Sequence, residues 1–177
     1  MRNPLPILSN LFSKKDSLEI SPKSADELEN SILLALLYIS KNIRPNGRFV
    51  YRNNLNPKKK YSDKYYSSLR HAGTLYSMYL CERLLGKEAL YNKRLLSSEY
   101  LVKNYIKKVG KDMYGLLSKP EEEAPALLAT SGGTGLALIA LSNLLKDNKI
   151  SKHILEKMGN FLIFMQTPQG FARVLNL

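Results

Sequence analysis

Two adjacent residues, Arg70 and His71, carry side chains that could take part in chemistry. They stand at the start of a predicted helix, directly before Ala72-Gly73-Thr74. A guanidinium can bind a substrate carboxylate or phosphate through two hydrogen bonds, and an imidazole can move protons near neutral pH. The alternative is that both side chains only satisfy loop carbonyls.

Carboxylates offer a second candidate chemistry. Cleavage of a glycosidic bond needs two carboxyl groups flanking the bond, one protonated as the acid and one ionised as the nucleophile or base. The candidates are Asp63, Asp112 and the run from Glu121 to Glu123. We take Glu121, Asp63 and His71 as candidate catalytic residues. The glutamate run could instead complement the dipole of a following helix.

Tyrosines near Arg70 could complete a binding site. Tyr65, Tyr66 and Tyr76 could stack on sugar rings, although tyrosines also commonly pack with the hydroxyl at the edge of a core. The candidate substrate-binding residues are therefore Arg70, Tyr66 and Tyr76.

The segment Ser131-Gly132-Gly133-Thr134-Gly135 lacks the Lys-Ser/Thr pair and the expected preceding strand of a phosphate-binding loop. Its glycines favour close packing of a helix instead.

His71, His153 and the single cysteine have no metal-ligand spacing. The sequence thus predicts neither a metal site nor a cofactor.

Charge and hydropathy limit the partners. The chain has 27 basic and 15 acidic residues, a net charge of +12 and a pI near 9.7, which favours anionic partners. No nucleic-acid-binding motif accompanies the dispersed lysines, so nucleic acid is not expected. The longest apolar run, Ile32 to Ile39, is far shorter than the ~18 residues of a membrane span. Without a secretory signal, we expect a cytoplasmic protein.

Helical periodicity starts at Ser24, after a predicted N-terminal tail of residues 1–23 that contains three prolines. Ser24-Ala25-Asp26-Glu27 has the capping-box pattern of a helix start. The first helix should end before Pro45-Asn46-Gly47, and residues 48–52 should form a short extended piece. Four more helices are predicted, at roughly 63–85, 93–109, 120–146 and 151–166.

The chain also repeats itself. Gly73-Thr74 falls on Gly133-Thr134 at an offset of 133 − 73 = 60 residues, and Gly110 falls on Gly170 at the same offset. Similarity at a fixed period is typical of a repeat architecture. The repeated unit is predicted to be an apolar inner helix, a short loop, an outer helix with one charged face, and a glycine turn.

Three segments resemble motifs of the α/α-toroid proteins, which include six-hairpin glycosidase-like enzymes and terpenoid-cyclase-like toroids. Residues 46–51 are similar to the Asp-Gly-x-Phe turn after outer helices, 166–171 to a Gln-rich Gly-aromatic turn, and 70–76 to an inner-helix opening of carbohydrate-active members. Asn46 and Gln169 stand where Asp is common. The resemblance implies an all-α fold in which residues 24–177 form a partial α/α toroid of helix-hairpin repeats, with about five helices.

What the resemblance implies for function is a fragment or partial form of a carbohydrate-active, glycosidase-like protein that acts on a polysaccharide or glycoconjugate. Two alternatives stay open: a non-catalytic, basic helical-repeat module that binds anionic polymers, and a remnant without activity. A closed toroid of six such units would need roughly 350 residues. Incomplete arrays leave apolar end faces, so self-association through the open ends is expected.

Overall fold

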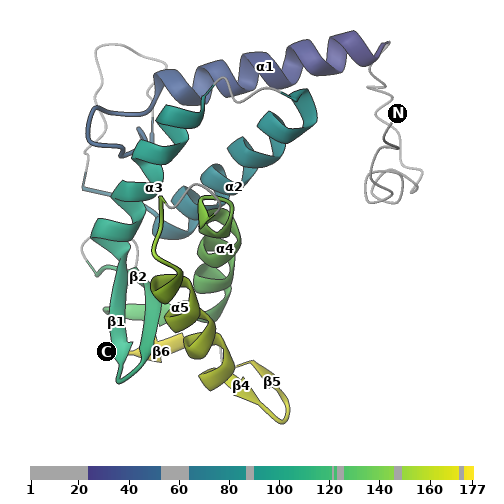
Figure 1. Ribbon diagram of the computed structural model, residues 1–177. Coiled ribbons are helices and arrows are strands. Elements are labelled where there is room, and N and C mark those ends of the chain that lie inside the picture. The colour runs from purple at the N-terminus through teal and green to yellow at the C-terminus, as the bar shows by residue number, and fades with distance from the viewer. Residues whose placement is uncertain are drawn as a thin grey trace, which may run out of the picture.

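The computed structural model describes residues 24–52, 64–86, 90–120, 122, 126–145, 149–171 and 174–177 (Figure 1). The helices in this part of the chain are α1 (Ala25–Lys41), α2 (Ser68–Leu85), α3 (Tyr91–Tyr105), α4 (Ser131–Ser142) and α5 (Lys152–Phe164). The strands are β1 (Ile106–Gly110), β2 (Met113–Ser118), β3 (Leu128–Thr130), β4 (Gln166–Thr167), β5 (Gly170–Phe171) and β6 (Val174–Asn176). The predicted tail, residues 1–23, lies outside the described residues.

The prediction of an all-α fold is wrong, because an antiparallel sheet follows α3. Four strands form this sheet in the order β1-β2-β3-β6. Ile106 pairs with Leu116, Leu117 with Ala129, and Ala129 with Leu175. The protein is therefore a mixed structure of helices and sheet, and a partial toroid built from helical hairpins alone does not describe it.

The all-α prediction failed because two of the predicted helices extend over segments that form strands. The periodicity predicts a third helix up to Val109, whereas α3 ends at Tyr105 and the next residues form β1. It also predicts a fourth helix soon after Pro120, whereas α4 starts at Ser131, after β3. A strand is stabilised by pairing with other strands, as β1 pairs with β2 and β3 with the distant β6, and local periodicity contains no information about such pairing.

Two predicted helix ends, the start of α1 and the end of α2, are confirmed. The Ser24 hydroxyl accepts a hydrogen bond from the Glu27 amide at 3.2 Å, so Ser24 is the N-cap of α1. Ser67 and Thr130 cap α2 and α4 in the same way, later in the chain than the predicted starts of these helices. Gly86 ends α2 in the left-handed conformation, with a φ of 61°.

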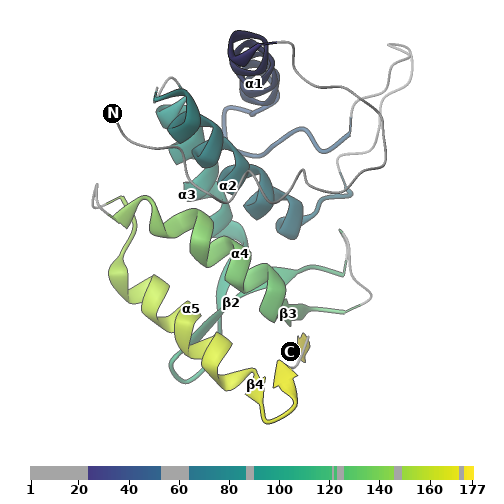
Figure 2. The same cartoon turned by 90° about the vertical axis from the view of Figure 1, so that its right-hand side faces the viewer.

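The main hydrophobic core lies where α2 packs on α4 and α4 packs on α5 and β2. Figure 2 shows α1, α2, α4 and α5 following one another from the top of the molecule to the bottom. Leu75, Leu101, Leu141 and Met158 are fully buried in this core, and burial of each such side chain contributes about 1.5–3 kcal/mol. A smaller cluster around Leu36 fixes α1 on α2.

The 60-residue offset relates whole elements of the structure, since α4 falls on α2 and α5 falls on α3 at this offset. In addition, each of α1, α3 and α5 is followed by a tight antiparallel turn. We call these hairpin 1 (residues 42–51, closed by the Ile43–Phe49 bridge), hairpin 2 (β1–β2) and hairpin 3 (β4–β5). Gly47 and Gly170 have φ values of 89° and 129°, so the two turns that resemble each other in sequence both require glycine.

Candidate functional site

A pocket of about 200 Å³ lies where the end of α1, hairpin 1 and the start of α2 meet. Aromatic rings, one arginine and several neutral polar groups line it, and we call it the aromatic pocket. Its lining residues are Tyr38, Ile39, Asn42, Phe49, Val50, Tyr51, Tyr66, Ser67, Arg70, His71 and Thr74. Three predicted site residues, Tyr66, Arg70 and His71, are thus brought together.

His71 lies at the floor of the aromatic pocket, where it is 2% exposed. Its Nε2 atom is 2.8 Å from the backbone oxygen of Ser97. Because a carbonyl oxygen only accepts, Nε2 carries the hydrogen, and Nδ1 accepts from the Tyr66 hydroxyl 2.6 Å away. Burial lowers the pKa of His71 to about 4, so the ring is neutral near pH 7. This geometry fits the alternative that His71 only satisfies a backbone carbonyl. A role of His71 in proton transfer stays a prediction.

Tyr66 connects the floor of the pocket to hairpin 1. Its hydroxyl donates to His71 and accepts from the Phe49 amide at 3.1 Å. The Arg48 guanidinium carbon lies 4.4 Å from the centre of the Tyr66 ring, and the Tyr105 ring stacks on it at 5.9 Å. Burial raises the pKa of Tyr66 well above its ordinary value, so the hydroxyl remains a donor.

The rim of the aromatic pocket is exposed, in contrast to its floor. Tyr38 is 61% exposed, and Arg70 is also exposed to solvent. The Arg70 guanidinium carbon lies 5.3 Å from the centre of the half-buried Tyr51 ring. Asn42 and Thr74 add an amide and a hydroxyl to the rim. A charged group, two aromatic faces and neutral polar groups are therefore accessible to a ligand.

Next to Tyr66, the buried phenol of Tyr105 forms hydrogen bonds with the carboxylate of Glu122. The Tyr105 hydroxyl donates to both carboxylate oxygens of Glu122, at 3.0 and 2.8 Å. Burial and the hydrogen bond to Glu122 raise the pKa of Tyr105. The Lys119 ammonium lies 4.6 Å from the centre of the same ring. Glu122 thus helps to hold the segment after β2 against the end of α3.

The other predicted site residues lie elsewhere. Glu121 and Asp63 are outside the described residues, so their catalytic roles stay predictions. Tyr76 is partly buried against the main core and does not line the aromatic pocket. Asp112 is exposed at the turn of hairpin 2, where it forms an ion pair with Lys157 at 3.4 Å.

Sequence reasoning missed part of the pocket wall. Phe49 and Tyr51 belong to the segment 48–52, which was predicted to be extended, and they line the pocket together with Val50. Tyr38 lies in the last turn of α1 and Asn42 is the C-cap, and the Asn42 side-chain amide donates to the Tyr38 backbone oxygen at 2.8 Å, so both lie on one face of this helix end. No local sequence pattern predicts that this end of α1 lies beside Arg70.

The strand β3 does precede Ser131–Gly135, contrary to expectation, but the residue pattern of a phosphate-binding loop is still absent. The predicted close packing holds at Gly133, where an added Cβ would lie 2.5 Å from the Thr130 hydroxyl and 3.1 Å from a Leu116 methyl. Gly133 therefore allows α4 to start directly against the sheet.

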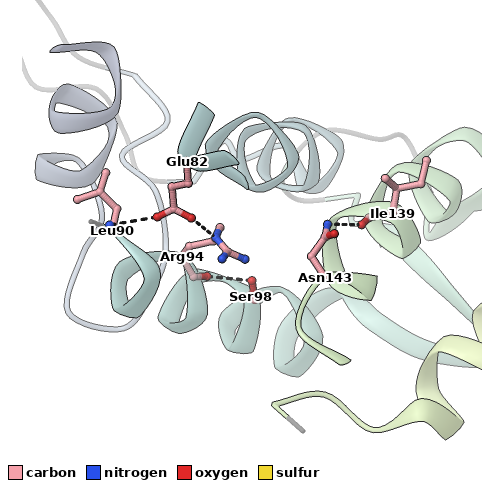
Figure 3. A network of polar contacts seen from close by, with 6 residues as sticks. All are labelled: Glu82, Leu90, Arg94, Ser98, Ile139 and Asn143. Carbon is pink, nitrogen blue, oxygen red and sulfur yellow. Dashed lines mark hydrogen bonds and ion pairs between the residues drawn. The ribbon is translucent and has the colours of Figure 1, made fainter. Parts of the chain in front are cut away.

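A second polar cluster connects α2 to α3 (Figure 3). The Arg94 Nε atom donates to Glu82 at 2.7 Å, and the other Glu82 oxygen accepts from the Leu90 amide at 3.1 Å. Glu82 and Arg94 are 3% and 4% exposed. Because this ion pair is inaccessible to solvent, its role is to fix the α2–α3 hairpin that supplies Ser97 to His71.

Within the part of the chain that the structure describes, no three His, Cys, Asp or Glu side chains lie close enough to hold a metal ion. None of the helices among these residues is long and apolar enough to cross a membrane. Comparison of the chain with protein-family models, curated proteins and solved structures finds no match.

Proposed function

We propose that the protein binds an acidic saccharide in the aromatic pocket. The observation that carries this proposal is the exposed Arg70 guanidinium beside the Tyr51 ring, at the rim of a pocket with a rigid aromatic floor. An aromatic face can stack on the apolar face of a sugar ring, and arginine pairs with a carboxylate through two parallel hydrogen bonds. Neutral polar groups such as Asn42 and Thr74 suit sugar hydroxyls.

The buried floor supports binding by keeping the rim in place. Tyr66 and His71 are each 2% exposed, and their hydrogen bonds hold hairpin 1 against α2 and α3. The rim residues Tyr51 and Arg70 are therefore positioned before a ligand arrives, which reduces the entropy lost on binding. The described wall of the pocket carries no carboxylate. The proposal is accordingly one of binding, and hydrolysis by Glu121 and Asp63 remains a prediction.

Calorimetric titration of the protein with a uronic-acid oligosaccharide, and with its carboxyl-reduced neutral counterpart, tests the proposal. Loss of one charge-assisted contact costs about 1.5–3 kcal/mol, so Arg70→Gln should weaken binding of the acidic sugar by roughly 10- to 100-fold. Tyr51→Ala should weaken binding of both sugars, since stacking does not depend on the carboxylate.

Arg83→Gln is the matched control for Arg70→Gln. Arg83 is an exposed arginine of the same helix that lies over another tyrosine, Tyr79, at 5.8 Å, outside the aromatic pocket. It should leave both affinities unchanged. Absence of binding at millimolar sugar, or an equal loss in the Arg70 and Arg83 variants, would count against the proposal.

A second candidate, binding of anionic polymers, is favoured by one observation. Lys103, Lys107, Lys108 and Lys111 are all exposed along the end of α3 and hairpin 2. Such binding should weaken steeply as the salt concentration rises. A double Lys107→Gln, Lys108→Gln variant should reduce the salt dependence of polymer binding and leave saccharide binding intact. The cytoplasmic location expected from the sequence stays a prediction beside both candidates.

A further inference from the structure

Hairpin 1 packs on the helix pair that follows it in the chain. The Ser97 hydroxyl of α3 donates to the backbone oxygen of Gly47 at 2.7 Å. A Cβ added to Gly47 would lie 2.3 Å from the backbone oxygen of Leu96, so the turn of hairpin 1 touches the backbone of α3. The hairpin after α1 thus covers the α2–α3 pair.

Hairpin 2 repeats this arrangement on the next helix pair. The Asn160 amide of α5 donates to the backbone oxygen of Asp112 at 3.2 Å, and Lys157 forms an ion pair with the same residue. The Leu116 amide donates to the Thr134 hydroxyl of α4 at 2.9 Å. In both hairpins, a turn carbonyl therefore accepts from a side chain of the outer helix of the following pair.

Hairpin 3 has the same position after α5, but it covers no helix among the described residues. Residues 166–170 are all exposed. The last turn of α5 also presents Ile163 and Phe164 to solvent, at 70% and 58% exposure. We call residues 163–170 the C-terminal surface. Large apolar side chains that are exposed together mark sites of protein interaction.

At the opposite end of the molecule lies an outer helix, α1, that no hairpin among the described residues covers. Hairpin 1 follows α1 as the other two hairpins follow α3 and α5, so α1 belongs to the outer class. Its middle presents Leu34, Leu37 and Tyr38, at 67%, 40% and 61% exposure, which we call the α1 surface. Figures 1 and 2 both show α1 at the top and hairpin 3 at the bottom of the molecule.

We propose that the C-terminal surface of one molecule docks on the α1 surface of a second copy. The contact would continue the hairpin-on-helix interface that the chain already makes twice within itself, with apolar side chains on both faces. Because the two surfaces differ and lie at opposite ends, the interface is heterologous, and association runs head to tail into rings or filaments.

Sedimentation velocity of the full chain over about 1 µM to 1 mM tests the proposal. The mass should rise with concentration beyond that of a dimer. Phe164→Glu and Leu34→Glu should each weaken association by about tenfold or more. Ile139→Glu is the matched control, because Ile139 is 50% exposed on α4, outside both surfaces. Unchanged circular dichroism would show that each variant folds.

An equimolar mixture of the two variants gives the decisive result. Each variant retains one intact surface, so Phe164→Glu and Leu34→Glu should be monomers alone and form a one-to-one complex when mixed. A wild type that stays monomeric at every concentration overturns the proposal. So does a two-fold dimer that only one of the variants disrupts. Neither Leu34 nor Phe164 lines the aromatic pocket, but Tyr38 belongs both to the α1 surface and to the pocket rim, so association is measured in the absence of sugar.

Discussion

The Nδ1 atom of His71 lies 2.6 Å from the hydroxyl oxygen of Tyr66, and both residues are buried. This contact is the centre of a chain of hydrogen bonds that starts at the Phe49 amide and ends at the Ser97 carbonyl. It joins hairpin 1, the start of α2 and the middle of α3. The shape of the aromatic pocket therefore depends on two side chains with little contact with solvent.

Replacing Tyr66 by phenylalanine should destabilise the protein. The variant Tyr66→Phe removes the hydroxyl and leaves the partly buried Phe49 amide and the buried His71 Nδ1 atom without this partner. Each unsatisfied group costs about 1–3 kcal/mol. Urea denaturation measures the loss. Tyr65→Phe, at a neighbouring tyrosine that is 52% exposed, is the control and should cost almost nothing. Equal stability of the two variants would contradict the proposed network.

Acid should destabilise the protein through His71. The pKa of its imidazole is about 4 in the folded protein and near 6.5 in the unfolded chain. Between these pH values the unfolded state binds more protons, so stability falls as the pH falls, by about 3 kcal/mol from pH 7 to pH 4. Urea denaturation across this range should show a shallower dependence on pH for His71→Gln than for the wild type. Parallel curves would refute this assignment.

The buried ion pair between α2 and α3 should be costly to break from one side. Glu82→Ala leaves the Arg94 charge buried without its carboxylate, which costs about 3–5 kcal/mol. The double variant Glu82→Leu, Arg94→Met removes both charges and should recover most of that loss. Thermal unfolding measures both, with the exposed Glu99→Ala as control. A Glu82→Ala variant as stable as the control would disprove the prediction.

Two positive-φ glycines should respond differently to alanine. Gly47 has a φ of 89°, and its added Cβ would lie 2.3 Å from the Leu96 backbone oxygen, so Gly47→Ala adds a clash to backbone strain. Gly86 has a φ of 61° and no neighbour within 4 Å, so Gly86→Ala costs only the strain, about 1 kcal/mol. Gly47→Ala should therefore be the more destabilised variant in urea, and the opposite order would show that hairpin 1 does not touch α3.

The structure brings only some of the predicted site residues together. Arg70 and His71 are adjacent in the sequence, and Tyr66 directly precedes Ser67, the N-cap of α2, so all three lie near the start of one helix. Tyr38 and Tyr51 reach the same pocket from α1 and hairpin 1. Their position depends on how hairpin 1 folds back onto α2, which is a contact between segments that no local pattern specifies.

The sequence by itself determined the presence of the helices, the start of α1 and the end of α2. Serine caps, the glycine at the end of α2 and the two positive-φ glycine turns act through neighbouring residues, so their effect is visible in the local pattern. The 60-residue offset likewise related α2 to α4 and α3 to α5.

Only the tertiary structure decided that the segments after α3 and before α4 are strands. Leu128–Thr130 pairs with β6, which lies far along the chain, and Ile106–Gly110 pairs with β2, whose other neighbour in the sheet is β3. The free energy of a strand comes from such partners, whereas that of a capped helix comes largely from its own turns and its buried face. The same long-range pairing makes the protein a mixed helix and sheet structure and places hairpin 3 at its exposed end.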